Sequence, residues 1–432
     1  MHQASSIQAV IDLIHDVEIS TLPADNIIAD YFRRRRYIGS SDRKFISETV
    51  YAIIRNKLSL QWLLSNASVA HASADARFAR LLVIAWLIDS NHNEQNIKEI
   101  FCSDRYSPER LSDFETSIIP KIKENLTRVK PENVKHNVPE WLAPELEESF
   151  GNSWQNHADA LNKPAQVDLR TNTLKATREQ ILFSLAQEGI KADVTKYSPW
   201  GIRISGNARL SPRNSVLSEG LAEVQDEGSQ LVSLITNAKP GQTVVDFCAG
   251  AGGKTLAIAA MMENKGSLYA LDVSQNKLDE AKRRFRRAGV SNVRTMISNA
   301  KWIKRHEGFA DVVLVDAPCS GSGTWRRNPD MKWRLSEKEL LRLIKLQSEI
   351  LNTAKCLVSK NGNLVYATCS VFREENDAQI KSFLEANTDL ILLDAGCKVL
   401  LCTDEIIDNG FLRISPLLNG TDGFFAAVLG RK

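Results

Sequence analysis

The chain has 432 residues, of which 43% are hydrophobic and 25% charged, as is typical of a globular protein with sizeable cores. Its formal net charge is only +3, so the whole molecule is not a strongly basic nucleic-acid binder, and a surface for nucleic acid must come from local clusters. The seven cysteines are scattered without a C-x-x-C pair, which argues against a disulfide framework and a structural metal site.

Scattered cysteines favour a reduced, cytoplasmic setting. The longest purely apolar run, residues 81–88, is far shorter than the roughly 18 residues of a membrane span. The first apolar patch contains His15 and Asp16 and has no basic lead, so it does not resemble a secretory signal. We therefore expect no membrane contact.

Residues 1–130 are predicted to form an all-helical domain. Val10, Ile14 and Val17 follow helical spacing, and the run 81–88 is predicted to be a buried helix of the same bundle. Four consecutive arginines, residues 33–36, lie in this part. They are equally consistent with a solvated helix end and with contact to an RNA backbone.

A polar stretch containing Pro131 and Pro139 marks a boundary, after which residues 139–232 are predicted to form a small α+β domain. From residue 233 to the C-terminus, short apolar strands alternate with amphipathic helices, which predicts a Rossmann-like α/β domain with a parallel sheet covered on both faces. The predicted strands are 243–247, 267–273, 292–298, 311–316 and 363–368, and the clearest predicted helices are 254–263, 275–288, 337–359 and 373–387.

The first of these strands leads into a glycine-rich turn, Cys248-Ala249-Gly250-Ala251-Gly252-Gly253-Lys254-Thr255, which allows a ligand to approach the backbone closely. The turn fits neither the phosphate-binding pattern G-x-x-x-x-G-K-[ST] nor the dinucleotide pattern G-x-G-x-x-G. Asp246 precedes the turn, and Asp272 ends the next strand, where a ribose diol is usually held. A carboxylate before the turn suits a cationic ligand without phosphates, and S-adenosylmethionine is such a ligand.

Two cysteines follow strand ends at the same predicted edge of the sheet. Cys319 comes after the strand that ends at Asp316, and Cys369 after the strand that ends at Thr368. Ligands of open α/β sheets bind beyond these carboxyl ends. Cysteines elsewhere are predicted to be small core residues: Cys102, Cys356, Cys397 and Cys402.

A cysteine at such a site is suited to methylation of cytosine. Carbon 5 of cytosine is a poor nucleophile, but addition of a thiolate to carbon 6 makes carbon 5 enamine-like and able to attack a sulfonium methyl group. One cysteine must add to the ring, and a second can assist loss of the proton or release of the product.

These residues resemble the Nop/Sun family of RNA 5-methylcytosine methyltransferases. The resemblance rests on the glycine turn, Pro318-Cys319 and Thr368-Cys369-Ser370, and residues 326–330 and 346–351 are similar to its bacterial 16S ribosomal RNA methyltransferase B branch. It covers about residue 139 to the C-terminus, including residues 170–173 and 225–227. The helical N-terminus is similar in character to the NusB-like RNA-binding domain of that branch.

The resemblance implies specific roles. Cys369 would be the nucleophile, Cys319 would help to release the product, and Asp316 would bind the cytosine edge and touch the cofactor. The turn from Cys248 to Lys254 would wrap the methionine part of S-adenosylmethionine, Asp272 would hold the ribose and Asn299 the adenine. Lys254 would also lie near the target base, and residues 139–232 would bind RNA, most simply ribosomal RNA.

Two departures from the family pattern concern the cofactor. The family usually has Ala-Pro where this chain has Gly250-Ala251, and an acid where Asn299 stands.

Basic residues alternate with aromatic ones just after the Cys319 loop. We expect these side chains to grip a phosphate backbone and stack a base: Trp325, Arg326, Arg327, Lys332, Trp333 and Arg334. The basic run 282–287 is expected to be a solvated helix face.

Two other functions compete with RNA cytosine methylation. A DNA cytosine methyltransferase would use Cys319 as its nucleophile, and the presence of Cys369 favours the RNA enzyme. A non-catalytic RNA-binding or assembly factor would bind no cofactor, and the intact Asp246, Asp272 and paired cysteines argue against it.

Overall fold

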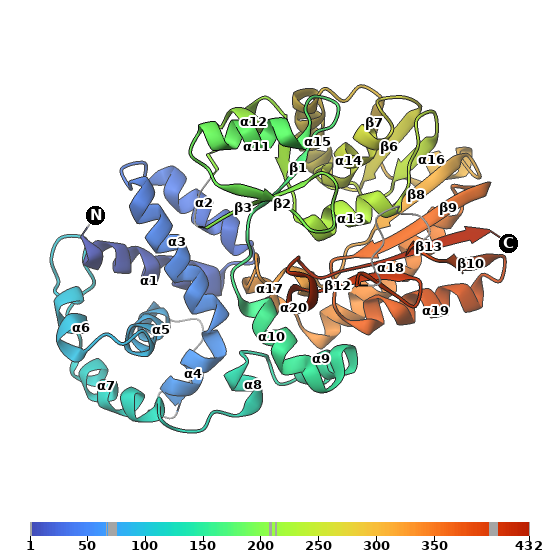
Figure 1. Cartoon of the computed structure of the whole chain (residues 1–432). Coiled ribbons are helices and arrows are strands. Elements are labelled where there is room, and N and C mark those ends of the chain that lie inside the picture. The colour runs from blue at the N-terminus through green and yellow to red at the C-terminus, as the bar shows by residue number, and fades with distance from the viewer. Residues whose placement is uncertain are drawn as a thin grey trace. The chain divides into compact units, whose positions relative to one another are not determined.

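The computed structural model describes residues 2–65, 67, 76–206, 210–211, 214–396 and 405–431. It divides the chain into two compact units, Met1–Asn162 with Arg327–Arg334, and Lys163–Arg326 with Leu335–Lys432 (Figure 1). Cys397 and Cys402 lie outside the described residues.

In the first unit, helices are the only regular elements among the described residues. Val10, Ile14 and Val17 are buried as their spacing predicts, and the predicted buried helix over 81–88 is α5. A NusB-like arrangement of these helices stays a prediction. The elements are α1 (Gln3–Ile19), α2 (Ala24–Arg34), α3 (Ser40–Arg55), α4 (Lys57–Ser65), α5 (Ala76–Asp89), α6 (Glu94–Ile100), α7 (Asp113–Asn125), α8 (Glu132–Lys135), α9 (Leu142–Phe150), η1 (Gly151–Ser153), α10 (Trp154–Asn162) and α17 (Asp330–Arg334).

Helix α17 is distant in sequence from the other helices of this unit and is tied to their ends. The Asp330 carboxylate accepts a hydrogen bond from the Ala24 N–H at the start of α2, at 3.0 Å. Arg334 donates to the Ser20 carbonyl at 2.7 Å, at the end of α1. An acid at a helix N-terminus and a base at a C-terminus both complement the helix dipole, so α17 stabilises the ends of two helices at once.

A four-stranded antiparallel sheet begins the second unit, with the strand order β2-β3-β1-β4. Its core contains Leu169, Ile202 and Ile204 from the strands and Ile181 and Leu185 from the covering helix. The elements are β1 (Asp168–Thr171), α11 (Arg178–Gln187), β2 (Ala192–Val194), β3 (Gly201–Ile204), α12 (Ser215–Ser218) and β4 (Ala222–Val224).

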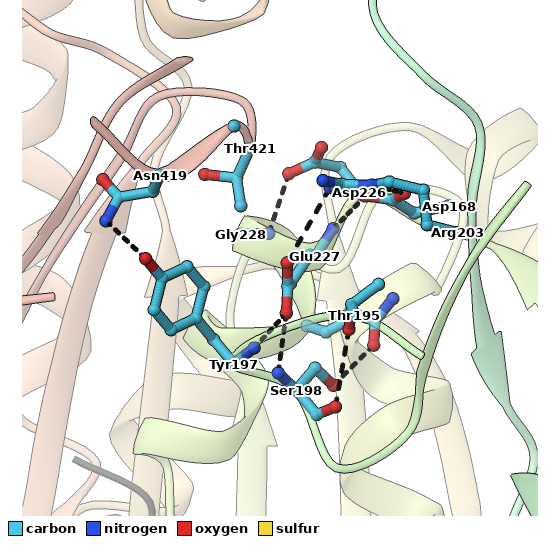
Figure 2. A network of polar contacts seen from close by, with 12 residues as sticks. Asp168, Thr195, Tyr197, Ser198, Arg203, Asp226, Glu227, Gly228, Asn419 and Thr421 are labelled. Carbon is cyan, nitrogen blue, oxygen red and sulfur yellow. Dashed lines mark hydrogen bonds and ion pairs between the residues drawn. The ribbon is translucent and has the colours of Figure 1, made fainter. Parts of the chain in front are cut away.

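A buried polar network joins this small sheet to the next helix, α13 (Glu227–Ile235) (Figure 2). The Glu227 carboxylate accepts hydrogen bonds from the backbone N–H groups of Tyr197 and Ser198 in the β2–β3 connection. Arg203 pairs with Asp168 through two hydrogen bonds of 2.7 and 2.8 Å. Glu227 is only 1% exposed, so it serves as the acceptor that water cannot supply to these two N–H groups.

The main sheet has the order β11-β12-β13-β9-β8-β5-β6-β7, and β10 also pairs with β13. Strands β5 to β9 are parallel as predicted, but β10 to β13 are antiparallel, so the sheet is mixed. The strands are β5 (Thr243–Asp246), β6 (Ser267–Asp272), β7 (Val293–Ile297), β8 (Ala310–Asp316), β9 (Val358–Thr368), β10 (Leu390–Leu393), β11 (Ile407–Asp408), β12 (Phe411–Ile414) and β13 (Phe424–Arg431).

Both faces of this sheet are covered by helices, so its strands are continuous apolar runs. Val312 and Leu314 of β8 belong to the core on one face, and Val313 and Val315 to the core on the other. The helices are α14 (Gly253–Met261), α15 (Gln275–Ala288), α16 (Ala300–Arg305), η2 (Ser322–Thr324), α18 (Glu337–Lys355), η3 (Arg373–Glu375), α19 (Asp377–Ala386) and α20 (Pro416–Asn419). Within the described ranges, no helix is both long and apolar enough to cross a membrane.

The network of Figure 2 generates a stability prediction. Glu227→Ala leaves two buried N–H groups without an acceptor and is expected to destabilise the protein by about 3 kcal/mol. Glu280→Ala, the same deletion at an exposed position of α15, is the matched control and should change stability by less than about 0.5 kcal/mol. The measurement is the midpoint of guanidinium-induced unfolding, and equal midpoints for the two variants would contradict the prediction.

Candidate active site

The glycine turn between β5 and α14 adopts the conformation that its sequence predicts. Gly250 and Gly252 have φ angles of +56° and +80°, in the left-handed region that favours glycine. A Cβ atom on Gly252 would lie 2.6 Å from the Phe285 ring, so α15 approaches the turn closely. At Gly250, by contrast, a Cβ atom would meet no atom of the described residues within 4 Å, so the turn is open on that side.

Asp246, at the end of β5, is buried directly beneath the turn. One oxygen accepts a hydrogen bond of 2.6 Å from the Thr255 hydroxyl, whereas Oδ1 has no hydrogen-bond partner among the described residues. Burial raises the pKa of Asp246 to about 7. The carboxyl group therefore titrates near neutral pH rather than remaining fully ionised.

Asp272 lies at the tip of β6 and faces the same turn. Its Oδ2 accepts a hydrogen bond of 2.9 Å from the Gly250 N–H, and its Oδ1 one of 2.8 Å from the Ser274 N–H. Asn299 follows the next strand, β7, and is exposed. Its amide oxygen accepts from the Trp302 N–H at 2.9 Å and caps α16, so part of its hydrogen-bonding capacity serves that helix.

The two strand-end cysteines lie together, as expected for neighbouring parallel strands β8 and β9. Their sulfur atoms are 3.4 Å apart. A hydrogen bond of 2.9 Å from the Gly323 N–H to the Cys369 carbonyl holds the two loops in register. The hydrogen bond with Cys369, together with burial, raises the pKa of Cys319 well above its ordinary value, so Cys319 is a thiol at neutral pH.

An ion pair lies close to the cysteines. Lys254, in the first turn of α14, donates to Asp316 Oδ2 at 2.7 Å. Burial lowers the pKa of Lys254, but Asp316, Cys369 and Asp246 offset this effect and the net shift is upward. Lys254 is thus a positive charge that is paired with Asp316 and interacts electrostatically with Cys369.

The loop that carries Cys319 is held by Glu375, a residue that the sequence did not single out. Glu375 is fully buried and accepts hydrogen bonds of 2.8 Å from the Ser320 N–H and from Gln347. Gln347 also donates to the Pro318 carbonyl at 3.1 Å. The residues on both sides of Cys319 are therefore fixed by side chains of η3 and α18.

Three buried hydroxyl groups lie beside Glu375. Those of Ser320, Ser322 and Ser370 are within 3.1 to 3.2 Å of one another and link the two cysteine loops directly. A cluster of serines after two strand ends is a signal in the sequence, but glycine and serine are also the ordinary residues of loops.

The prediction of an RNA-binding segment after the Cys319 loop is wrong for most of its residues and stays a prediction for Arg327. Trp325, Arg326 and Lys332 are buried, and Arg327, Trp333 and Arg334 are half-buried. Arg326 donates to the Gly420 and Thr421 carbonyls, and Trp333 Nε1 donates to the Ile54 carbonyl at 2.7 Å. These groups stabilise the fold, because the segment turns inward instead of facing solvent.

The prediction that Cys356 is a core residue is also wrong. Helix α18 ends at Lys355, so Cys356 is its C-terminal cap and is exposed. Cys102 packs against the helical core as expected. In the basic runs, Arg33, Arg34 and Arg36 are exposed, and so are residues 282, 283, 286 and 287.

Asp246 gives a pH prediction. Since its folded pKa of about 7 lies above its ordinary value of 3.8, the native state binds more protons than the unfolded state between these pH values. Asp246 therefore makes the protein progressively less stable as pH rises from about 4 to 7. Asp246→Asn removes this effect, so its melting temperature should exceed that of the wild type by a margin that grows over this range. The prediction would be contradicted if the difference in melting temperature between the variant and the wild type were the same at every pH.

Comparisons with known proteins agree with this architecture. Residues 233–430 match the family described as 16S rRNA methyltransferase RsmB/F, and residues 138–211 match the RsmF/B-like ferredoxin-like domain. A ribosomal RNA small subunit methyltransferase B of Photorhabdus laumondii is 33% identical over 308 residues, covering 69% of this chain and 68% of that protein. One of Pectobacterium carotovorum is 27% identical over 414 residues, covering 91% and 92%.

The fold is also found in solved structures. The crystal structure of a protein called PH0851 has a TM-score of 0.81 and 28% identity, and the match covers 100% of this chain and 99% of that one. The chain belongs to the RsmB/F (Nop/Sun) family of 16S ribosomal RNA methyltransferases and is an RNA methyltransferase with a Rossmann-like catalytic fold.

Proposed function

We propose that the chain transfers the methyl group of S-adenosylmethionine to carbon 5 of a cytosine in 16S ribosomal RNA, through a covalent bond between Cys369 and carbon 6. The observation that carries the proposal is the pair of sulfur atoms 3.4 Å apart at the carboxyl ends of β8 and β9, close to the Lys254–Asp316 ion pair. Relatives named ribosomal RNA small subunit methyltransferase B support the RNA class of the substrate.

The residues at the glycine turn fit S-adenosylmethionine. The open side of the turn at Gly250 leaves space for a ligand, and Cys248 to Lys254 would wrap the methionine part. Each oxygen of Asp272 already accepts one backbone N–H, and its remaining lone pairs would accept the hydroxyl groups of the ribose. Asn299 would contact the adenine, and Asp316 would lie near the methyl group. When bound, S-adenosylmethionine supplies an electrophilic methyl group on a sulfonium centre.

Cys369 would act on the cytosine ring. Its thiolate adds to carbon 6, the electrons move to carbon 5, and carbon 5 becomes nucleophilic enough to accept the methyl group. Asp316 would hold the exocyclic amino edge of the base, and the Lys254 cation would stabilise negative charge near the sulfur. Loss of the carbon 5 proton to a water molecule acting as base then re-forms the C5–C6 double bond and expels the thiolate of Cys369.

Cys319 would assist the last step. Its raised pKa keeps it a thiol at neutral pH, so its S–H can donate to the sulfur of Cys369 as that sulfur leaves carbon 6. This arrangement gives the two cysteines different roles: the one that retains a proton stabilises the departing thiolate of the other.

The cytosine would have to leave its stack to reach Cys369. We propose that residues 139–232 contact the RNA around the target, and that the exposed arginines at 33, 34 and 36 contribute to the backbone affinity of the helical domain over residues 1–130.

The nucleophile is tested by trapping the covalent intermediate. Cys369→Ala is expected to abolish an RNA adduct that survives denaturing electrophoresis and to lower methyl transfer by at least about 1000-fold. Cys319→Ala, the matched control at the neighbouring sulfur, should still form the adduct and accumulate it because release is slowed. Loss of the adduct only in Cys319→Ala would reverse the assignment and favour the chemistry of DNA cytosine methyltransferases.

The base and position are tested in cells. Bisulfite sequencing of 16S ribosomal RNA is expected to find a cytosine that is protected in cells carrying the gene and converted in cells lacking it. Restoring the wild-type gene should restore protection, and restoring Cys369→Ala should not. Identical conversion in all strains would contradict methylation at carbon 5 of this RNA. Calorimetry with S-adenosylmethionine separates the enzyme from a non-catalytic RNA-binding protein, which would show no binding.

A further inference from the structure

Two arginines bind backbone carbonyl groups of the glycine turn. Arg170, from β1 of the small sheet, donates to the Gly253 carbonyl at 2.6 Å. Arg284, from α15, donates to the Ala251 carbonyl at 2.8 Å. The turn is therefore held from outside the main sheet by two guanidinium groups, one of which comes from a different sheet.

A buried carboxylate lies opposite Arg170 and pairs with Arg284. Glu223 pairs with Arg170 across the β1–β4 ladder and is 4% exposed. Its carboxylate forms an ion pair with Arg284 at 3.0 Å and accepts a hydrogen bond from Arg287. Gln225, two residues further along the chain, accepts a hydrogen bond from Arg170. The hydrogen bonds of Arg170 and Arg284 to the glycine turn are thus part of a buried polar network that includes residues of the small sheet.

Arg170 is an unfavourable residue for stability at this position. It is 3% exposed, and burial lowers its pKa to about 10, so it stays cationic at neutral pH. Its Nε–H is buried without a hydrogen-bond partner among the described residues. A buried charge whose hydrogen bonds are incomplete costs stability, and an apolar side chain of similar volume is often as stable or more so. Its presence therefore calls for a role other than stability.

We propose that Arg170 is a positioning residue for cofactor binding: by holding the Gly253 carbonyl, where the glycine turn passes into α14, it fixes the turn in its open shape. A turn that is already fixed in its binding shape loses less conformational entropy when the methionine part of S-adenosylmethionine binds. The inference rests on the proposed function, because the ligand of the turn is the one proposed there. It adds that the small sheet, which we propose contacts RNA, also sets the affinity for the methyl donor.

The test is calorimetric titration of the full chain with S-adenosylmethionine. Arg170→Met keeps the volume and removes the donors, and it is expected to weaken binding about tenfold, the effect of losing one charge-assisted hydrogen bond. The KM for S-adenosylmethionine should rise by a similar factor, with little change in kcat at saturation. Arg170→Lys, which retains one cationic donor, should recover part of the affinity.

Arg203→Met is the matched control, since Arg203 lies on the neighbouring strand and pairs with Asp168 rather than with the turn. It is expected to lower the melting temperature while leaving the affinity for S-adenosylmethionine unchanged. The proposal is overturned if Arg170→Met binds the cofactor like the wild type, or if both variants lose affinity in proportion to their loss of melting temperature. If the wild type itself does not bind S-adenosylmethionine, the proposed function is wrong. If the wild type binds and Arg170→Met binds equally well, only the role of Arg170 is wrong.

Discussion

Parallel pairing of β8 with β5 and β9 determines where chemistry can take place in this chain. The carboxyl ends of parallel strands meet at one edge, so residues that are far apart in the sequence become neighbours there. Cys319 and Cys369 are separated by 50 positions, yet their sulfur atoms lie 3.4 Å apart. The glycine turn after β5 and Asp272 at the end of β6 lie at the same edge, so a methyl donor bound at the turn can meet the base that accepts the methyl group.

The loops at this edge are held by buried side chains that satisfy their backbone polar groups. Glu375 and Gln347 fix the backbone on both sides of Cys319, and the Arg170 and Arg284 guanidinium groups fix the glycine turn. The carbonyl and N–H groups of the loops are satisfied in this way, although the Arg170 guanidinium itself keeps one N–H without a partner among the described residues. A shift of about 1 Å in a reacting group can cost a large factor in rate, so we infer that these clamps contribute to the reaction without touching the substrate.

The elements with a clear period in the sequence were predictable, and so were the residues at their ends. The alternation of strands and helices after residue 243 predicted the parallel core of the sheet, and the residues after each strand predicted the edge on which the glycine turn, Asp272 and the two cysteines lie. Prediction from the sequence failed where the role of a residue depends on contacts with residues that are distant in the chain. Glu375 is a single polar residue in a short helix, and nothing local distinguishes it from a solvated position. Gln347 lies in the stretch 346–351 that resembles the family, but the resemblance does not say which groups it contacts.

The wrong predictions have similar causes. Trp333 and Arg334 have the composition of an RNA-binding segment, but their partners are helix ends more than 270 residues earlier in the chain. Strands β10 to β13 were not predicted because they are short or lie at the end of the chain, where no following helix marks the period.

Helix α17 has a consequence for how the protein can be divided. The backbone leaves the helical unit after Asn162, returns to it for residues 327–334, and leaves again. The helical unit is therefore non-contiguous, and it is connected to the catalytic unit by three peptide crossings instead of one. A truncated chain that starts at residue 163 would still carry Asp330 and Arg334 but would lack the helix ends that they cap. For this reason the helical unit cannot be removed by a single cut in the chain. A relative that lost it during evolution would have had to change the segment immediately after the Cys319 loop.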